Sequence, residues 1–242
     1  MNTKSEIVSL DTDVLIIGGG LAGCMAAIKA REYGVSVAIA EKANTLASGC
    51  AGSGIDHMWA YIPPVHEKMG YSIEDLIESH TQVIARGFID PELIYLIARE
   101  SYNRMLDLER FGINFRYEDS KIPGKFRIVP QFHSVPSSFN FDGRDVKVHL
   151  TKEARKREVK IINRVTMVDL LSSSDGHISG ALGVGTRDGK VYFFKTKAVV
   201  LSTGRVNRLS RSITGVWGNH RVPVNETGDG RAMAFRAGLP II

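Results

Sequence analysis

The architecture of the chain is encoded near its start, in the stretch Asp13-Val-Leu-Ile-Ile-Gly-Gly-Gly-Leu-Ala-Gly23. The continuous apolar run at 13–17 predicts a strand buried on both faces, as in a parallel sheet. The small residues at 21–33 predict a helix, which we expect to end at Gly34. A second apolar run at 35–40 predicts another buried strand. Together the three segments have the length of one right-handed parallel crossover.

Four glycines lie at the junction between the first strand and the helix, and three of them have the spacing Gly18-x-Gly20-x-x-Gly23. In dinucleotide-binding folds the first glycine permits the tight turn and the second lets the backbone touch a pyrophosphate, while the third lets helix and strand pack closely. Glu41 closes the second strand, about 20 residues on, where an acid accepts hydrogen bonds from ribose hydroxyls. The junction therefore predicts a dinucleotide site.

The composition is that of an ordinary globular protein, with 242 residues, 43% of them hydrophobic, and a net charge of +5. The two cysteines, Cys24 and Cys50, exclude a disulfide scaffold and lack the spacing of a zinc site, so we expect no metal. The basic residues are scattered, so we expect no nucleic-acid partner. The N-terminus is polar and no apolar run reaches the ~20 residues that cross a bilayer. We therefore expect no signal peptide, no membrane insertion and a cytoplasmic location.

The remaining pattern indicates a larger α/β fold. Ser72 and Asp90-Pro91 are suited to begin helices, whereas the segment 115–143 has no clear period and predicts an irregular, partly exposed connection. We expect a Rossmann-like domain, with a parallel sheet flanked by helices. The further predicted helices are 72–85, 91–111, 146–157 and 231–237, and the further strands are 159–162, 165–171, 178–186, 191–195 and 198–201.

The order of the short motifs resembles that of one family. From about Thr12 to the end, the chain is similar to the flavoprotein subunits of fumarate reductase, succinate dehydrogenase and adenylylsulfate reductase. The resemblance implies that 1–242 is the N-terminal portion of an FAD-binding domain with an inserted small antiparallel sheet at 165–195. It also implies that the family's capping domain and C-terminal segment are absent. The motifs are Gly18–Gly23, Glu41-Lys42, Ser48-Gly49, Leu201–Gly204, Thr227–Gly230, Met233-Ala234 and Ala237-Gly238.

The resemblance also implies where FAD would lie. The loop at 48–52 would run along the flavin, the strand that begins at Val165 would bind adenine through its backbone, and Asp229 would face the ribityl–phosphate region. A helix that begins at Gly230 would add a second positive dipole end there. The candidate cofactor-binding residues are Gly18, Gly20, Leu21, Ala22, Gly23, Glu41, Lys42, Ser48, Gly49, Cys50, Gly52, Val165, Ser202, Thr203, Gly204 and Asp229.

Some positions depart from the family or allow more than one interpretation. Membrane-bound relatives attach FAD to a histidine where this chain has Gly49, so we expect non-covalent FAD. Lys42 fits either a contact to a 2′-phosphate or a solvent-facing lysine, and the second interpretation is favoured. His57 and His66 follow the flavin loop, but satisfied or exposed histidines are the favoured interpretation. No catalytic residue is assigned.

The function implied is that of a flavin-dependent oxidoreductase. It would pass electrons between a small anionic substrate and a redox partner. The expected partner chains are an iron–sulfur electron-transfer subunit or a complementary C-terminal chain. We expect this chain alone to bind FAD weakly or not at all and to lack turnover. Two alternatives stay open: an NAD(P)-dependent dehydrogenase with a Rossmann fold, and a nucleotide-binding module active only with a second chain.

Overall fold

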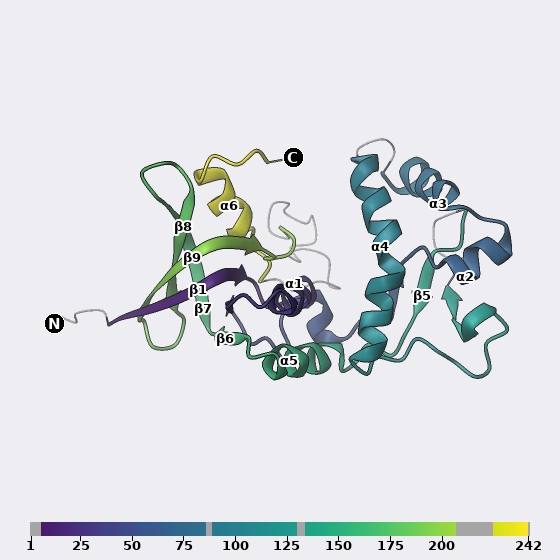
Figure 1. The fold of residues 1–242 in the computed structure, drawn as a ribbon, viewed down its shortest axis with the longest axis horizontal. Coiled ribbons are helices and arrows are strands. Elements are labelled where there is room, and N and C mark those ends of the chain that lie inside the picture. The colour runs from purple at the N-terminus through teal and green to yellow at the C-terminus, as the bar shows by residue number, and fades with distance from the viewer. Residues whose placement is uncertain (1–5, 86–88, 130–133, 207–224, 242) are drawn as a thin grey trace, which may run out of the picture. The chain divides into compact units, whose positions relative to one another are not determined.

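A computed structural model describes residues 6–85, 89–129, 134–206 and 225–241 (Figure 1). The chain divides into two compact units. The first unit comprises Met1–Gly54 and Lys147–Ile242, and the second comprises Ile55–Val146. Within the described ranges, no helix is long and apolar enough to traverse a bilayer.

The first unit is built on a six-stranded sheet with strand order β6-β2-β1-β9-β8-β7. The pairs β6–β2, β2–β1 and β1–β9 are parallel, and β9–β8 and β8–β7 are antiparallel. The α/β fold with a mainly parallel sheet and a small antiparallel part is therefore confirmed. The strands are β1 (Ile7–Ile17), β2 (Val37–Glu41), β6 (Lys160–Asn163), β7 (Val165–Ser172), β8 (Ile178–Gly185) and β9 (Val191–Leu201).

Strand β9 corrects the prediction of two separate strands at 191–195 and 198–201. It is continuous, and it pairs with β1 from Ile7↔Val191 to Ile17↔Leu201 while its first half also pairs with β8. Thr196 continues the strand between the two apolar runs, because its buried hydroxyl donates to the Asp13 carbonyl at 3.0 Å. The antiparallel hairpins are therefore an extension of the parallel sheet, joined to it through β9.

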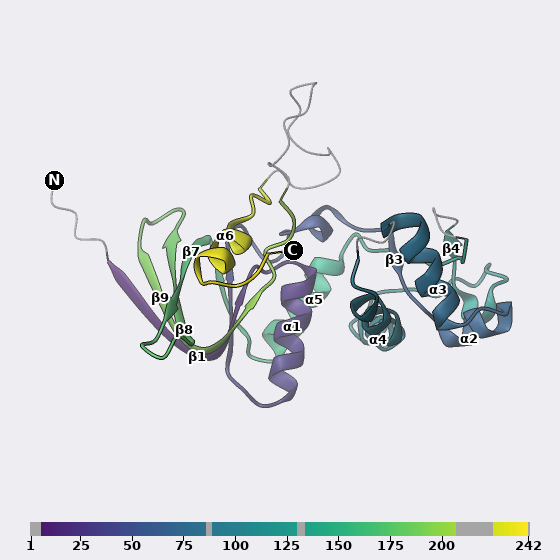
Figure 2. The same ribbon diagram turned by 90° about the horizontal axis from the view of Figure 1, so that it is seen from above.

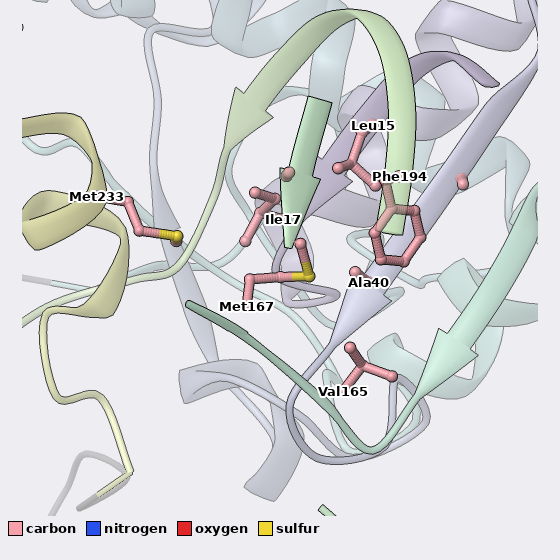
Figure 3. Packing of buried hydrophobic residues seen from close by; sticks show 9 residues of the cluster. Leu15, Ile17, Ala40, Val165, Met167, Phe194 and Met233 are labelled. Atoms are coloured by element: carbon pink, nitrogen blue, oxygen red, sulfur yellow. The ribbon is translucent and has the colours of Figure 1, made fainter. Parts of the chain in front are cut away.

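The core of the first unit lies between the parallel strands and the antiparallel extension. The sheet curls so that β7 contacts β2, although the two strands are four places apart in the strand order. Figure 3 shows Phe194 of β9 beside Leu15 of β1, with side chains of β2, β7 and α6 completing the cluster. Its buried members are Leu15, Ile17, Ala38, Ala40, Val165, Met167, Ala181, Phe194 and Met233.

In the described part of the chain, the helices of the first unit are α1 (Leu21–Glu32), α5 (Val146–Lys156) and α6 (Asp229–Arg236). Helix α1 packs on β1 and β2, and α5 lies beside it in both views (Figures 1 and 2). Arg31 near the end of α1 donates from Nε to the Arg157 carbonyl at 2.6 Å, which holds the C-terminal ends of α1 and α5 together. Helix α6 contacts β7.

The second unit is mainly helical. As the sequence predicts, Ser72 caps a helix in a capping box with Asp75, and Asp90 caps another with Pro91 at its first position. The first of these is regular only to His80 and then becomes a π-helical turn over Thr81–Ala85. Among the described residues of this unit, the α-helices are α2 (Pro63–His66), α3 (Ile73–His80) and α4 (Pro91–Arg110).

The segment 115–143 is more ordered than the sequence predicts. It carries β4 (Ile128–Val129) and β5 (Ser138–Asn140), which form an antiparallel sheet with β3 (His57–Trp59) in the order β3-β5-β4. Four of its phenylalanines are buried, and their rings pack in two pairs, one tilted with centroids 4.6 Å apart and one edge-to-face with centroids 5.6 Å apart. The prediction of an irregular, partly exposed connection is confirmed for most of the described segment, but it missed the core that these aromatics build: Phe115, Phe126, Phe139 and Phe141.

Candidate cofactor-binding site

The turn from β1 into α1 needs glycine at two positions. Gly18 has a φ of +102°, and a Cβ on it would overlap the Ser202 carbonyl. A Cβ on Gly23 would overlap the Gly18 carbonyl oxygen, so the first turn of α1 lies directly against the end of β1. Both contacts are backbone contacts, which cannot be relieved by a side-chain rotation. The glycines therefore have the turn and packing roles that their spacing predicts.

Helix α1 begins without a side-chain cap. Its N-cap is Gly20, in an extended conformation, and Leu21 and Ala22 open the first turn. A Cβ on Gly20 would meet only the Gly49 Cα, at 3.9 Å, so the backbone there is accessible. The first N–H groups of a helix have no intrahelical acceptors and carry a partial positive charge. This end of α1 is thus suited to an anion, and the space beside Gly20 fits a group that approaches the backbone closely.

Glu41 places a buried carboxylate beside this turn. Parallel pairing of Ile17 with Ala40 brings the carboxyl ends of β1 and β2 together. Glu41 is 6% exposed, and its Oε2 accepts from the Gly19 N–H at 2.6 Å while Oε1 accepts from the Ala43 N–H at 2.6 Å. The acid expected at the end of the second strand therefore does lie at the glycine turn.

The loop at 48–52 meets the same turn. The hydroxyl of Ser48 donates to the Gly19 carbonyl at 2.9 Å. Gly49 has a φ of +73°, and a Cβ on it would lie 3.2 Å from the Gly20 Cα. A Cβ on Gly52 would overlap the Ala47 carbonyl. Two loops that are about 30 residues apart in sequence are thus in backbone contact at the N-terminus of α1.

Cys50 faces a carboxylate that the sequence analysis missed. Its Sγ lies 3.2 Å from Oε1 of Glu226, which is buried. Burial and then the hydrogen bond and charge of Glu226 raise the pKa of the Cys50 thiol. No local pattern marks Glu226, because its burial depends on the fold around the Thr227–Gly230 motif. The thiol is held in its protonated form at neutral pH.

The interpretation of Lys42 as a solvent-facing lysine leaves out its pairing, because the side chain is partly exposed and its ammonium group is also hydrogen-bonded. Its Nζ lies 2.7 Å from Oδ2 of Asp229, 3.1 Å from the Thr227 hydroxyl and 2.7 Å from the Asn225 carbonyl. Burial raises the pKa of Asp229, but the hydrogen bonds from Lys42 and Thr227 outweigh it and leave the pKa below its ordinary value. The end of β2 is therefore tied to the start of α6.

The loop after β9, at 202–204, also contacts the glycine turn. Ser202 donates from its N–H to the Ile17 carbonyl at 2.9 Å and from its hydroxyl to the Gly18 carbonyl at 2.8 Å. Thr203 lies against Gly230, because a Cβ on Gly230 would overlap the Thr203 hydroxyl. Gly204, with a φ of +78°, lies beside the Glu226 carboxylate.

Val165 and the two histidines have different surroundings. Val165 is buried in the core and pairs with Gly185, and the preceding Arg164 donates from its N–H to the Ala43 carbonyl at 3.1 Å. The start of β7 is therefore close to the end of β2. His66 is buried in the second unit, where it accepts from the Ile62 N–H and donates to the Pro136 carbonyl, and burial lowers its pKa. His57 is exposed beside Asp56.

Lys147 is a second residue that the sequence analysis missed. It lies on α5 with 2% of its surface exposed, and its Nζ donates to the Gly19 carbonyl at 2.6 Å. In sequence it is one lysine in an amphipathic helix rich in lysine and arginine, so no signal distinguished it from its exposed neighbours.

Comparison with known proteins agrees with this geometry. The family model described as "FAD binding domain" matches residues 13–242. The chain belongs to this FAD-binding family. It is 28% identical to one of the subunits of fumarate reductase (CoM/CoB) from Methanothermobacter marburgensis, over 96% of this chain and 41% of that protein. It is 27% identical to the mitochondrial "Succinate dehydrogenase [ubiquinone] flavoprotein subunit" of Oryza sativa subsp. japonica, over 99% of this chain and 38% of that protein.

A solved structure shows the same fold. Adenylylsulfate reductase from Archaeoglobus fulgidus superposes with a TM-score of 0.80 and 26% identity, over 97% of this chain and 37% of that one. The resemblance to the fumarate reductase, succinate dehydrogenase and adenylylsulfate reductase flavoproteins is thus confirmed, and FAD is the cofactor of the family. The NAD(P)-dependent dehydrogenase is not favoured. This FAD-binding chain spans about two fifths of the length of the relatives it matches.

Proposed function

We propose that the chain is the FAD-binding portion of a flavin-dependent oxidoreductase that moves electrons between a small anionic substrate and a redox partner. One observation carries the proposal. The uncapped N-terminus of α1 at Gly20 adjoins a buried carboxylate, Glu41, and a second loop touches it at Gly49. An anion-binding helix end beside an acid suits a diphosphate joined to a ribose.

The residues around the turn would hold the cofactor as follows. The amides of Gly20, Leu21 and Ala22 would bind the diphosphate, and Glu41 would accept from the ribose hydroxyls. Asp229 at the start of α6 would lie toward the ribityl–phosphate side, and the start of β7 at Val165 toward the adenine. We assign supporting roles to Gly18, Gly23, Lys42, Ser48, Gly49, Cys50, Gly52, Ser202, Thr203 and Gly204.

We propose that FAD is held without a covalent bond. Covalent attachment in the family needs a histidine at the position of Gly49. Here that residue has a φ of +73°, a conformation that L side chains rarely adopt. The close approach of Gly49 to Gly20 also leaves little room for a Cβ. Acid precipitation should therefore release all the flavin into the supernatant, and flavin that stays with the pellet would contradict this assignment.

When bound, FAD supplies the two-electron chemistry, and the protein supplies position and charge. The chain's own residues would fix the adenine half of the cofactor at the turn after β1, and the loop at 48–52 would exclude water along one edge of the flavin. We place the residues that bind substrate in the remainder of a longer protein or in a complementary chain. An iron–sulfur subunit is the redox partner we propose.

Absorbance of the purified chain tests the proposal. Bound flavin gives two visible bands, and titration of apoprotein with FAD should quench flavin fluorescence to saturation. A colourless chain that binds NADH instead of FAD would contradict it. Substrate reduction by the chain alone would contradict the need for the rest of the protein. The cytoplasmic location expected above stays a prediction, which cell fractionation tests.

A further inference from the structure

Lys147 has its ammonium group buried beneath the glycine turn. Burying a charge costs folding free energy unless the charge is paired and hydrogen-bonded, so the partners of Lys147 indicate its role. The Nζ lies 2.6 Å from the Gly19 carbonyl oxygen and 3.1 Å from the Cys24 Sγ. Burial raises the pKa of the Cys24 thiol, more than the nearby Lys147 lowers it. The carbonyl oxygen is thus the strong acceptor for this cation.

Gly19 is held by opposite charges at its two ends. Its N–H donates to the Glu41 carboxylate at 2.6 Å. Its carbonyl accepts from Lys147 at 2.6 Å, from the Ser48 hydroxyl at 2.9 Å and, more weakly, from the Cys24 thiol at 3.5 Å. Hydrogen bonds to charged groups are about twice as strong as neutral ones. Gly19 and its two charged partners therefore form one arrangement whose effect is to fix the peptide planes on either side of Gly19.

The orientation of one plane bears directly on the proposed diphosphate site. A trans peptide carries its C=O and the following N–H on opposite sides. Because the Gly19 oxygen points at the buried ammonium of Lys147, the Gly20 N–H points away from it, at the uncapped start of α1. A cation on the oxygen also draws electron density from the amide and makes that N–H a stronger donor.

We propose that Lys147 is a positioning residue for FAD, which orients and polarises the Gly19–Gly20 peptide so that the Gly20 N–H binds the diphosphate. The inference rests on the proposed function, since it names a residue that acts on the same site through the Gly19 carbonyl. Lys147 does not need to touch the cofactor. Its charge acts through protein rather than water, where the effective dielectric constant is low, and it adds to the positive end of α1.

Variants of Lys147 in ¹⁵N-labelled protein test the proposal with two readouts. In the apoprotein, K147M should move the amide nitrogen resonance of Gly20 upfield, because the cation no longer polarises the preceding carbonyl. In titrations, K147M should weaken FAD binding about tenfold or more, as expected when a charged hydrogen bond is lost. The matched control is K152M, the same substitution at an exposed lysine of the same helix. It should leave the Gly20 resonance in place and the FAD affinity within about threefold of wild type.

Each outcome decides the question. A folded K147M with an unmoved Gly20 resonance, or with FAD affinity close to that of wild type, overturns the proposal. If K147M does not fold, K147Q decides, because glutamine keeps a donor but not the charge: wild-type affinity in K147Q overturns it, and binding weakened about tenfold supports it. Wild-type protein that binds NADH and not FAD contradicts the proposed function instead, and the Gly20 resonance of the apoprotein still reports on Lys147.

Discussion

Glu41 and Lys42 are neighbours in the chain, but their charges are in opposite physical situations. The Glu41 carboxylate is buried and accepts two backbone N–H groups, whereas the side chain of Lys42 is 35% exposed and pairs with an equally exposed Asp229. The buried acid fixes a turn of the backbone before any ligand arrives. The exposed pair joins two segments but is screened by water, and such pairs contribute about 0–1 kcal/mol.

The contrast between the buried Glu41 and the exposed Lys42 indicates which part of the site is rigid and which part can adjust. The buried side consists of backbone atoms of Gly18–Gly23 in contact with one another or with buried charges. The exposed side consists of side chains that can change rotamer at little cost. Changes on the buried side should therefore have large effects on FAD retention and stability, and changes on the exposed side small ones.

The largest effect is expected from G23A. A Cβ at this position would overlap the Gly18 carbonyl, and relief requires α1 to move away from β1. Overpacking of this kind costs about 3 kcal/mol, and the displaced helix would no longer present its amides to the diphosphate. We expect loss of bound flavin in gel filtration and a lower midpoint in urea.

The matched control for G23A is G34A, just after the same helix. Gly34 has a φ of +77° but open space around its Cβ position. The expected cost is about 1 kcal/mol from backbone strain alone, with flavin retained. If G23A binds FAD as well as G34A does, the rigid contact between α1 and β1 is not what supports the site.

The second largest effect is expected from E41A. It removes an acceptor shared by two backbone N–H groups and, under the proposed function, by the ribose. Losing charged hydrogen bonds costs about 1.5–3 kcal/mol, which corresponds to FAD binding weakened about 10- to 100-fold. Fluorescence titration measures it, with E118A as a control because that carboxylate is 87% exposed in the second unit. Unchanged affinity in E41A would refute the ribose role.

The sequence predicted the rigid part of the site well, because that part depends on local signals. A continuous apolar run, three spaced glycines and an acid after the next strand are all visible in 13–41, and the structure brings them together. Helix starts at Ser72 and Asp90 were predicted for the same reason, since a cap is a local interaction.

The failures all involve partners distant in sequence. The buried ammonium of Lys147 donates to the Gly19 carbonyl, which is 128 residues away. The continuity of β9 depends on Thr196 reaching the Asp13 carbonyl, 183 residues away. The aromatics of 115–143 have no helical or strand period, because they pack onto one another across turns. Periodicity detects a face that repeats along one element, and none of these contacts is of that kind.

A smaller effect is expected on the exposed side, from D229N. The pKa of Asp229 is lower in the folded chain than its ordinary value, so the pair stabilises the fold above about pH 3.9 and this contribution is lost as pH falls through the folded pKa. Replacing the carboxylate should therefore cost under about 1 kcal/mol near neutral pH and nothing in strong acid. Urea titrations across this range measure it. A loss that persists in acid would show that the Asp229 charge is not the cause.

The smallest effect is expected at Cys50, on the border between the two sides. Burial and the negative charge of Glu226 raise the pKa of its thiol, so alkylation should be slower than for a free cysteine. E226Q keeps the shape of the side chain but removes its charge, which should lower the pKa of the Cys50 thiol. A pKa lower by about one unit would raise the thiolate fraction, and with it the alkylation rate, by about tenfold. Mass spectrometry after timed iodoacetamide treatment follows Cys50 separately from buried Cys24. An unchanged or slower alkylation rate in E226Q would mean that burial alone raises the pKa of the Cys50 thiol. Cys50 would then be grouped with the buried, rigid part of the site.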